Sequence, residues 1–387
     1  MQAASAPPSV ESRVKPRRRL TFVSECTPDP LGVGWEQRAY SLLLAYSRFM
    51  DVDLWFMPSP DNPDLARASP LSALCRSLTA FYPSAIDDGR SGLRARLFGH
   101  LSSSAAVHVF RFQAFVQGIR HPCVVWDIDE LPWFMGNRGP AAGLPSMPAG
   151  QRARPDAAFS ACLGKCRLVI GCSPLERPDG CAGFATIPNA VRAPPAAAAP
   201  SPTPDGSLLF VGNLNHVPNL DGLAFFRHQV LPTLDRLVVP AARVVVAGRA
   251  PVAPESRAAV AGLQEGGRLR FEFDVPDCGP FYARSTASIA PIRFGAGTRV
   301  KIIESFAHRC PVVSTAKGCE GLDVEHGRHL LIADQPQDFA QACAQVLGNP
   351  QLRRRIADDA FRHYERGHTQ EVVDALLRST IGKLLGD

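Results

Sequence analysis

Residues 290–307 combine a glycine-rich turn with charged side chains on a predicted helix, a pattern that can hold a nucleoside diphosphate. An apolar run predicts a strand, Gly295 and Gly297 predict a turn, and Thr298 is a suitable N-cap for the helix that follows. The helix has an apolar stripe of Val300, Ile303 and Ala307. Glycines let a ligand approach the backbone closely, and the N–H groups at the start of a helix attract an anion.

Lys301 and Glu304 are three residues apart on this helix, so both are expected to project from one face. From Thr298 to Glu304 the helix rises about 9 Å, at about 1.5 Å per residue. That is the reach from a diphosphate to the hydroxyls of a ribose. A cation near the phosphates and a carboxylate near the diol suit a nucleotide-sugar donor, and Arg293 and Arg299 flank the turn as further cations. The alternative is an ordinary strand–turn–helix unit with charged surface residues.

The composition is that of a globular enzyme with two domains. The chain has 387 residues, of which 45% are hydrophobic and 20% charged, so a disordered protein is not expected. A formal net charge of +6 permits an anionic ligand but does not favour nucleic acid. Lys15 and the arginines at 17–19 would allow a weak contact with a membrane surface, although a solvated tail is the preferred interpretation. No pattern indicates an oligomeric state.

The eleven cysteines are scattered, without the paired spacing of a zinc site, so no metal is predicted. The first 16 residues lack the apolar core of a signal peptide, and no run of about 18 apolar residues could span a bilayer. We therefore expect a reduced cytoplasmic protein.

Short apolar runs alternate with helix-like stretches, which is typical of α/β architecture with parallel sheets. The predicted strands are residues 20–24, 52–57, 106–110, 123–127 and 168–171 in the first half, and 208–212, 244–248, 269–273, 288–291, 311–314 and 329–332 in the second. Two sheets of similar size imply a cleft, where the carboxyl ends of the strands would bind ligands. Residues 136–150 predict an exposed loop, and residues 351–385 a helical segment.

Residues 192–204 are rich in proline and alanine and predict a semi-rigid linker between two domains. The expected organisation is a disordered tail (1–16), an N-terminal Rossmann-like domain (17–191), the linker (192–204), a C-terminal Rossmann-like domain (205–366) and a terminal helix (367–387).

Two other groups of residues have chemical potential. Asp127, Asp129 and Glu130 follow a predicted strand and could bind a metal, act as a base or contact the acceptor, but a helix start that satisfies backbone donors is preferred. Residues 172–174 read as a turn rather than a nucleophile site, and residues 323–329 as a solvated turn.

The second half resembles the nucleotide-binding domain of GT-B glycosyltransferases, in particular the retaining family 4 enzymes (glycosyl transferases group 1) of polysaccharide biosynthesis. The matching segments occur in the family's order. They are residues 209–214 (LFVGNL), 218–221 (PNLD), 247–249 (AGR), 275–277 (VPD), 290–307, 311–314 (PVVS) and 318–322 (GCEGL).

The first half resembles the family more faintly. Gly32 and Gly34 precede a helix that contains Arg38, as in the family's N-terminal glycine loop. Residues 187–191 (IPNAV) are similar to the motif that closes the first domain. The resemblance implies two Rossmann-like domains facing across a cleft, with the donor held by the second domain and the acceptor by the first. It also implies a last helix that crosses back to the first domain.

The sequence departs from the family at two places. The first of the family's two glutamates is replaced by Ala296, whereas Glu304 matches the second. The usual basic phosphate clamp is absent, because Asn213 follows Gly212 and Pro218 precedes Asn219. We therefore assign phosphate contact to Lys301 and the backbone of 295–298.

The candidate residues form three sets. The catalytic candidates are Lys301, Glu304 and Arg293. The donor-binding candidates are Gly212, Asn213, Arg249, Phe294, Gly295, Ala296, Gly297, Thr298 and Arg299. The acceptor-side candidates are Gly32, Gly34, Arg38, His108 and Arg111. Either His108 or Arg111 would replace the family's catalytic histidine, but a histidine buried in a strand is the preferred interpretation of His108.

The expected function is transfer of a hexose from a UDP- or GDP-sugar to a hydroxyl of a glycan, a lipid-linked carrier or a small metabolite, with retention and without a metal or a tightly bound cofactor. Two alternatives stay open. One is a catalytically silent GT-B module that binds a nucleotide sugar or a partner enzyme, and the other is a sugar-nucleotide epimerase.

Overall fold

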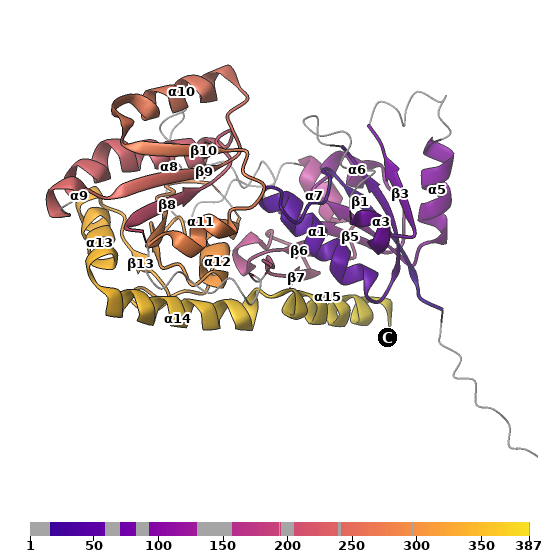
Figure 1. Ribbon diagram of the computed structural model, residues 1–387. Helices are drawn as coiled ribbons and strands as arrows, with labels where there is room; N and C mark the ends of the chain where they lie inside the picture. Colours follow the sequence, from indigo (N-terminus) through magenta and orange to yellow (C-terminus); the bar gives the residue numbers. More distant parts are fainter. Residues whose placement is uncertain are drawn as a thin grey trace, which may run out of the picture.

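The computed structural model describes residues 16–58, 70–82, 93–129, 157–192, 194, 205–238, 241–295 and 297–386. These residues form two α/β domains side by side, with the indigo and magenta N-terminal part in one and the orange and yellow part that precedes the last helix in the other (Figure 1). The predicted tail, the 136–150 loop, almost all of the linker, and Ala296 lie outside the described residues. The domain boundaries thus stay a prediction.

The N-terminal domain is built on a parallel sheet of seven strands in the order β3-β2-β1-β4-β5-β6-β7. Its strands are β1 (Arg19–Ser24), β2 (Asp51–Phe56), β3 (Ser77–Ala80), β4 (Ala106–Phe110), β5 (Val124–Asp127), β6 (Leu168–Gly171) and β7 (Phe184–Thr186). Its helices are α1 (Gly34–Ser47), α3 (Leu71–Leu74), α5 (Leu93–Ser103), α6 (Gln113–Gly118), α7 (Ala157–Leu163) and the 3₁₀ turn η3 (Pro174–Glu176). Parallel pairing brings the carboxyl ends of all these strands to one edge.

The C-terminal domain has a parallel sheet of six strands in the order β10-β9-β8-β11-β12-β13. Its strands are β8 (Ser207–Val211), β9 (Arg243–Gly248), β10 (Leu269–Phe273), β11 (Ala287–Ala290), β12 (Val312–Ser314) and β13 (Leu331–Ile332). Its helices are α8 (Val217–Phe225), the π-helical η4 (Phe226–Val230), α9 (Leu231–Leu237), α10 (Pro254–Gln264), η5 (Glu265–Gly267), α11 (Gly279–Arg284), α12 (Val300–Ala307), α13 (Pro336–Gly348) and α14 (Pro350–Gly367).

The last helix, α15 (Gln370–Leu385), follows α14 and lies under the N-terminal domain (Figure 1). It packs against α1, where Gln370 Nε2 donates to Ser41 O at 2.9 Å. The predicted helical segment 351–385 is therefore two helices. They separate because Gly367 ends the first and Thr369 caps the second by accepting from Val372 N.

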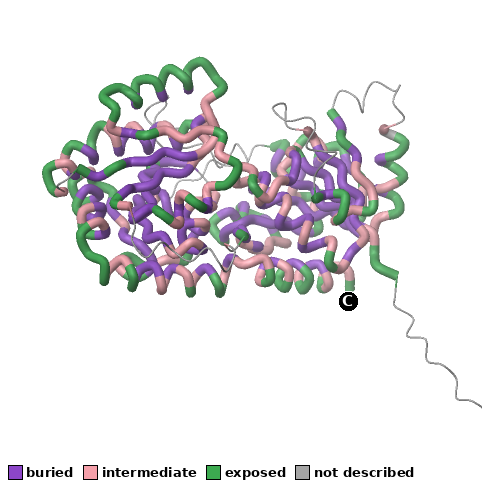
Figure 2. Tube along the Cα trace, viewed as in Figure 1, coloured by how far each residue is buried: buried purple, intermediate pink, exposed green. Residues whose placement is uncertain are grey.

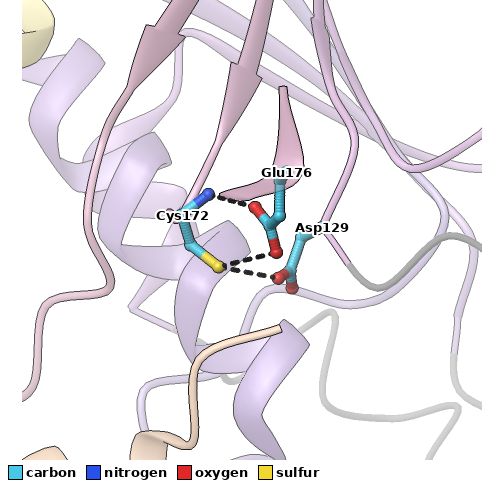
Figure 3. Close-up of side chains that lie close together, drawn as sticks. All are labelled: Asp129, Cys172 and Glu176. Carbon is cyan, nitrogen blue, oxygen red and sulfur yellow. Dashed lines mark hydrogen bonds between the residues drawn. The ribbon is translucent and has the colours of Figure 1, made fainter. Parts of the chain in front are cut away.

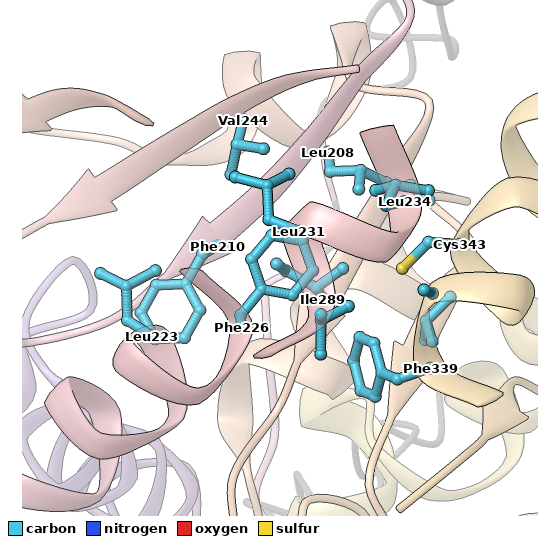
Figure 4. Close-up of a cluster of buried hydrophobic side chains, with 14 of the residues drawn as sticks. Leu208, Phe210, Leu223, Phe226, Leu231, Leu234, Val244, Ile289, Phe339 and Cys343 are labelled. Carbon is cyan, nitrogen blue, oxygen red and sulfur yellow. The ribbon is translucent and has the colours of Figure 1, made fainter. Parts of the chain in front are cut away.

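Each sheet is buried inside its domain, as the purple strands in Figure 2 show. β4 and β8 are buried along their whole length, which explains why their sequences are apolar without alternation. In the C-terminal core, Phe210 and Ile289 from the sheet meet Phe226 and Phe339 from the covering helices (Figure 4). These cores hold the strand ends, and hence the loops between the domains, in place.

The predicted α/β class with two Rossmann-like domains is confirmed. Every strand predicted from the sequence is present within two residues of its predicted bounds. β3 and β7 were missed because they are short edge strands, SLTA and FAT, with only one fully buried residue between them.

Candidate functional site

A cavity of about 460 Å³ lies between the two domains, in the size range of small-molecule sites. The N-terminal domain contributes the loop before α1 and the start of that helix, residues 30–37. The C-terminal domain contributes the ends of β8 and β9, the loop before α11, and one face of α12. The cavity therefore lies at the carboxyl ends of the strands, as predicted for an open α/β sheet.

The structure brings together nine of the predicted site residues around this cavity. They are Gly32, Gly34, Gly212, Asn213, Arg249, Thr298, Arg299, Lys301 and Glu304. Among the described candidates, the residues outside its lining are Arg38, His108, Arg111, Arg293, Phe294, Gly295 and Gly297.

Lys301 reaches the cavity from the first turn of α12. Its Nζ donates to Asn219 Oδ1 at 2.8 Å and lies 4.5 Å from the centre of the Phe210 ring. Asn219 is held in turn, because its Nδ2 donates to Asn213 O at 2.9 Å. Asn219 thus orients the ammonium group toward the cavity, where the charge of Lys301 also acts to lower the pKa of Glu304.

Glu304 lies one turn further along the same face of α12. Its carboxylate accepts from Gln37 Nε2 of the opposite domain at 3.1 Å and from Tyr282 OH at 2.9 Å. Burial raises the pKa of Glu304, while these hydrogen bonds oppose the shift by stabilising the charged form. The predicted common face of Lys301 and Glu304 is present, and Glu304 also joins the two domains.

Thr298 does not cap α12, contrary to the sequence prediction. The helix begins at Val300 with Arg299 as the N-cap residue, and no side chain caps it. The Thr298 hydroxyl instead accepts from Asn189 Nδ2 at 2.8 Å. The apolar stripe is also wider than predicted, because Ile302 and Phe306 are buried with Ile303 and Ala307 while Val300 is half-buried.

The turn before α12 has the backbone conformation that its glycines predicted. Gly295 has a φ of 110° and Gly297 a φ of 77°, which other residues rarely adopt. Arg299 folds back over this turn and donates to Phe294 O at 3.4 Å. Arg293 is exposed instead, and its guanidinium donates to Asp221 at 2.8 Å and covers the Phe225 ring at 5.2 Å. Arg293 therefore supports the turn rather than lining the cavity.

Two side chains at the start of α1 reach across the cavity. Gln37 contacts Glu304, and Glu36 Oε2 accepts from Arg249 Nη2 at 2.7 Å and from Val33 N at 2.8 Å. Burial raises the pKa of Glu36, and Arg249 is the main group that opposes this shift. The Glu36 carboxylate therefore binds a cation, Arg249, and a backbone N–H group at the start of α1. Cations and helix N-termini are also the two kinds of group that bind phosphate.

Arg38 is a structural residue and does not reach the cavity. Only 1% of it is exposed, and its guanidinium donates to both Asp127 oxygens, at 3.2 and 2.8 Å. The same side chain donates to Ile187 O and to Asn189 Oδ1, both at 2.9 Å. Asp127 thus pairs with Arg38 rather than serving a metal or an acceptor, while Glu130 lies outside the described residues.

His108 is buried in β4, as the preferred interpretation predicted. It is fully buried, stacks on Phe22 at 4.5 Å and shares a hydrogen bond of 3.0 Å with Tyr46 OH. Burial, reinforced by the charge of Arg38, lowers the pKa of His108 to about 3. This imidazole is neutral and enclosed.

Arg111 follows β4 with a φ of 63° and approaches the cavity indirectly. Its guanidinium lies 5.1 Å from the centre of the Trp35 ring, and Trp35 lines the cavity. Its Nε is 3.6 Å from Glu25 Oε2. Arg111 therefore supports the wall of the cavity on the N-terminal side.

Comparison with known proteins identifies the family of the C-terminal part of the chain. Residues 205–349 match the model of the family described as glycosyl transferases group 1. Residues 205–349 form a glycosyl transferases group 1 domain. The predicted class of enzyme, a glycosyltransferase, is thereby confirmed.

Solved structures match over almost the whole chain. Sucrose-phosphate synthase from Thermosynechococcus elongatus is 17% identical with a TM-score of 0.70, covering 96% of this chain and 100% of that one. HepE of Anabaena in complex with UDP is 13% identical with a TM-score of 0.66, covering 94% and 100%. At this identity the matches show the fold, and the predicted GT-B arrangement is confirmed.

A curated relative matches over a shorter stretch. An uncharacterized 44.6 kDa protein in the cps region of Klebsiella pneumoniae is 28% identical over 171 residues. The match covers 43% of this chain, and the chain spans 44% of the length of that relative.

Among the described residues, no helix has the length and apolar character needed to cross a bilayer.

Within this glycosyltransferase, sequence reasoning gave no role to several residues of the cavity. Gln37, Asn219 and Tyr282 are uncharged, and their importance lies in contacts with Lys301 or Glu304 from distant parts of the chain. His216 also lines the cavity, and burial next to Arg299 and Lys301 lowers its pKa to about 4. The sequence could not reveal this arrangement, because Arg299 and Lys301 lie far from His216 in the chain and no spacing motif connects them.

Asp129, Cys172 and Glu176 form a buried cluster in the N-terminal domain (Figure 3). The Cys172 thiol lies 3.1 Å from Glu176 Oε1 and 3.6 Å from Asp129 Oδ1, and Cys172 N donates to Glu176 Oε2 at 2.6 Å. Burial raises the pKa of the Cys172 thiol well above its usual value and that of Glu176 to about 7. A metal would need the thiolate, so the cluster is best described as a proton-sharing network.

This cluster predicts a specific dependence of stability on pH. The folded protein keeps a proton on Glu176 up to about pH 7, whereas the unfolded chain releases it near pH 4.5. Stability should therefore fall as the pH rises through that window, by about 1–3 kcal/mol. Glu176→Gln, which stays neutral, should flatten the dependence in urea denaturation at pH 5 and pH 8. Equal slopes for the variant and the wild type would contradict this assignment.

Proposed function

We propose that the protein transfers a hexose from a nucleoside diphosphate sugar to a hydroxyl of a glycan, a lipid-linked carrier or a small metabolite, with retention at the anomeric carbon. The observation that carries the proposal is the shared face of α12, from which Lys301 and Glu304 enter the cavity between the domains. The cps-region relative supports a substrate in polysaccharide biosynthesis.

The charges around the cavity suit a diphosphate next to a ribose. Arg249, Arg299 and Lys301 supply three cations at one end, and Glu304 lies about 4.5 Å further along α12 than Lys301, at about 1.5 Å per residue. Lys301 and the backbone of the 295–298 turn would stabilise the charge that develops on the leaving diphosphate. Glu304 would accept the ribose hydroxyls, as a buried carboxylate that already accepts two hydrogen bonds.

In the proposed reaction the bond from the anomeric carbon to the diphosphate oxygen breaks while the acceptor oxygen bonds to that carbon. The acceptor hydroxyl passes its proton to an oxygen of the leaving diphosphate, and the nucleoside diphosphate departs. The N-terminal wall, residues 30–37, would receive the acceptor and exclude water from the donor. The basic residues take the place of a metal in this scheme, so turnover is expected to persist in a chelator.

The donor is proposed to be a UDP- or GDP-sugar. The HepE structures contain UDP or UDP-glucose, which makes UDP-glucose the first probe to try. All eleven cysteines lie among the described residues and are free, which favours a reducing compartment such as the cytoplasm.

A donor panel tests this proposal. We expect calorimetry to show binding of at least one of UDP-glucose, UDP-galactose, UDP-N-acetylglucosamine and GDP-mannose, and cell extract as acceptor to release the nucleotide diphosphate. Glu304→Gln should weaken donor binding, whereas Glu255→Gln, at the exposed start of α10, should not. Failure of every donor to bind would end the proposal.

A silent module is the second candidate, and two features of the sequence favour it. Ala296 stands where the family has its first glutamate, and Asn213 and Pro218 replace the basic clamp expected near the start of the C-terminal domain. Binding of a donor without any release of nucleotide in the presence of cell extract would support this alternative.

A further inference from the structure

Asn189 lies in the segment that leaves the last strand of the N-terminal domain, and it contacts both domains. It follows β7 and precedes the C-terminal domain, yet only 4% of it is exposed. Its side-chain oxygen, its side-chain nitrogen and its backbone oxygen each have a hydrogen-bond partner within 3.0 Å. A buried amide with this many partners has one orientation.

On the N-terminal side, Arg38 fixes the orientation of the Asn189 amide. Arg38 Nη1 donates to Asn189 Oδ1 at 2.9 Å, and Arg38 is itself held by both oxygens of Asp127. A guanidinium only donates hydrogen bonds, so the atom that it contacts must be the amide oxygen. The amide nitrogen is therefore directed away from Arg38.

On the C-terminal side, that nitrogen meets the turn that leads into α12. Asn189 Nδ2 donates to Thr298 Oγ1 at 2.8 Å, and His368 Nδ1 donates to Asn189 O at 3.0 Å. Thr298 lines the cavity and lies three residues before Lys301. The Asn189 side chain is thus a rigid link from the Arg38–Asp127 ion pair to the turn.

The turn benefits from such a link because its glycines lose much conformational freedom when they are fixed. Gly295 and Gly297 have positive φ angles, which glycine adopts readily but with a large loss of conformational entropy on folding. No side chain caps the start of α12, since the Thr298 hydroxyl is bonded to Asn189 instead. The position of the backbone N–H groups in this turn then depends on what holds Thr298.

We propose that Asn189 is a positioning residue: it holds Thr298 so that the turn before α12 and Lys301 keep the geometry that binds the donor diphosphate. The role rests on the proposed function, because it acts on the donor site. Asn189 itself is not among the residues that line the cavity, and its effect on the donor passes through Thr298.

Hydrogen exchange of the protein without ligand is the first test. In Asn189→Ala, we expect the amides of residues 297–301 to exchange at least tenfold faster, while amides in β8 and β9 keep their protection. Thr298→Val removes the acceptor of the same hydrogen bond and should have the same local effect, so it serves if Asn189→Ala does not fold. Asn349→Ala is the matched control, because Asn349 caps α14 through Leu352 N, far from the turn.

Donor affinity is the second test, measured by calorimetry with the donor that the wild type binds. Asn189→Ala and Thr298→Val are each expected to weaken binding about tenfold. The double variant should bind no more weakly than the weaker single variant, because both changes break the Asn189–Thr298 hydrogen bond through which Asn189 acts on the donor site. Asn349→Ala should lower the melting temperature without changing affinity.

The outcomes separate this inference from the proposed function. A wild type that binds no nucleotide sugar would end the proposed function, while the exchange experiment would still decide whether Asn189 orders the turn. Unchanged exchange at 297–301 in both variants would overturn the inference. So would additive losses of affinity, or a melting temperature that falls with affinity intact.

Discussion

Replacing Lys301 by alanine is expected to lower turnover at least tenfold while the fold stays intact. The Lys301 ammonium lies in the cavity, aimed by Asn219 at 2.8 Å, where it would face the departing diphosphate. A cation that stabilises charge formed in the transition state acts mainly on kcat, and a tenfold loss corresponds to about 1.4 kcal/mol. Losses of about a hundredfold are common when one such group is removed. The measurement is nucleotide release with the best donor, together with a melting curve.

Two variants make this result specific. Lys383→Ala changes an exposed lysine near the end of α15 and should leave kcat unchanged. Lys301→Arg keeps the charge but not the fit to Asn219, so it should recover only part of the activity. A Lys301→Ala enzyme with the kcat of the wild type would exclude Lys301 from the chemistry.

Arg38→Met is expected to be the most destabilising of the single changes considered. Arg38 and Asp127 are 1% and 0% exposed, and Arg38 also satisfies Ile187 O and Asn189 Oδ1. Removing the guanidinium leaves a buried carboxylate without its counter-charge, which typically costs about 3–5 kcal/mol. Urea denaturation at neutral pH measures the loss.

An exposed ion pair provides the control for this prediction. Arg362 is paired with Asp359 on the surface of α14, with 61% of its side chain exposed, so Arg362→Met should change stability little. Asp127→Leu combined with Arg38→Met should recover much of the lost stability, because the unpaired charge is gone. If Arg38→Met alone unfolds at the urea concentration of the wild type, the ion pair is not a main support of the N-terminal domain.

The fold was predictable from the sequence because buried parallel strands leave a strong signal. Runs such as 208–212 and 244–248 are apolar on both faces, and their positions in the structure differ by a residue at most. The short edge strands β3 and β7 carry no such signal, since one side of an edge strand has no neighbour. The break between α14 and α15 is visible only in hindsight, as Gly367 followed by the N-cap Thr369.

The candidate site was predictable only in part. The spacing of Lys301 and Glu304 is a local property of one helix, and both line the cavity as that spacing implies. Arg38 was a candidate because it follows a glycine loop that resembles the family's, but the structure pairs it with Asp127, which is 89 residues away in the sequence. The roles of Gln37 and Asn189 likewise depend on contacts made when the two domains meet, and these contacts leave no mark in local sequence.

The return of α15 to the N-terminal domain means that the polypeptide passes between the two domains twice. The two passages are fastened together, because Val191 N donates to His368 O at 3.0 Å and Tyr364 OH donates to Val191 O at 3.1 Å. If one domain rotates relative to the other, points close to this fastened crossing move least. Such a rotation would change the separation of residues 30–37 from α12 more than the contacts beside His368.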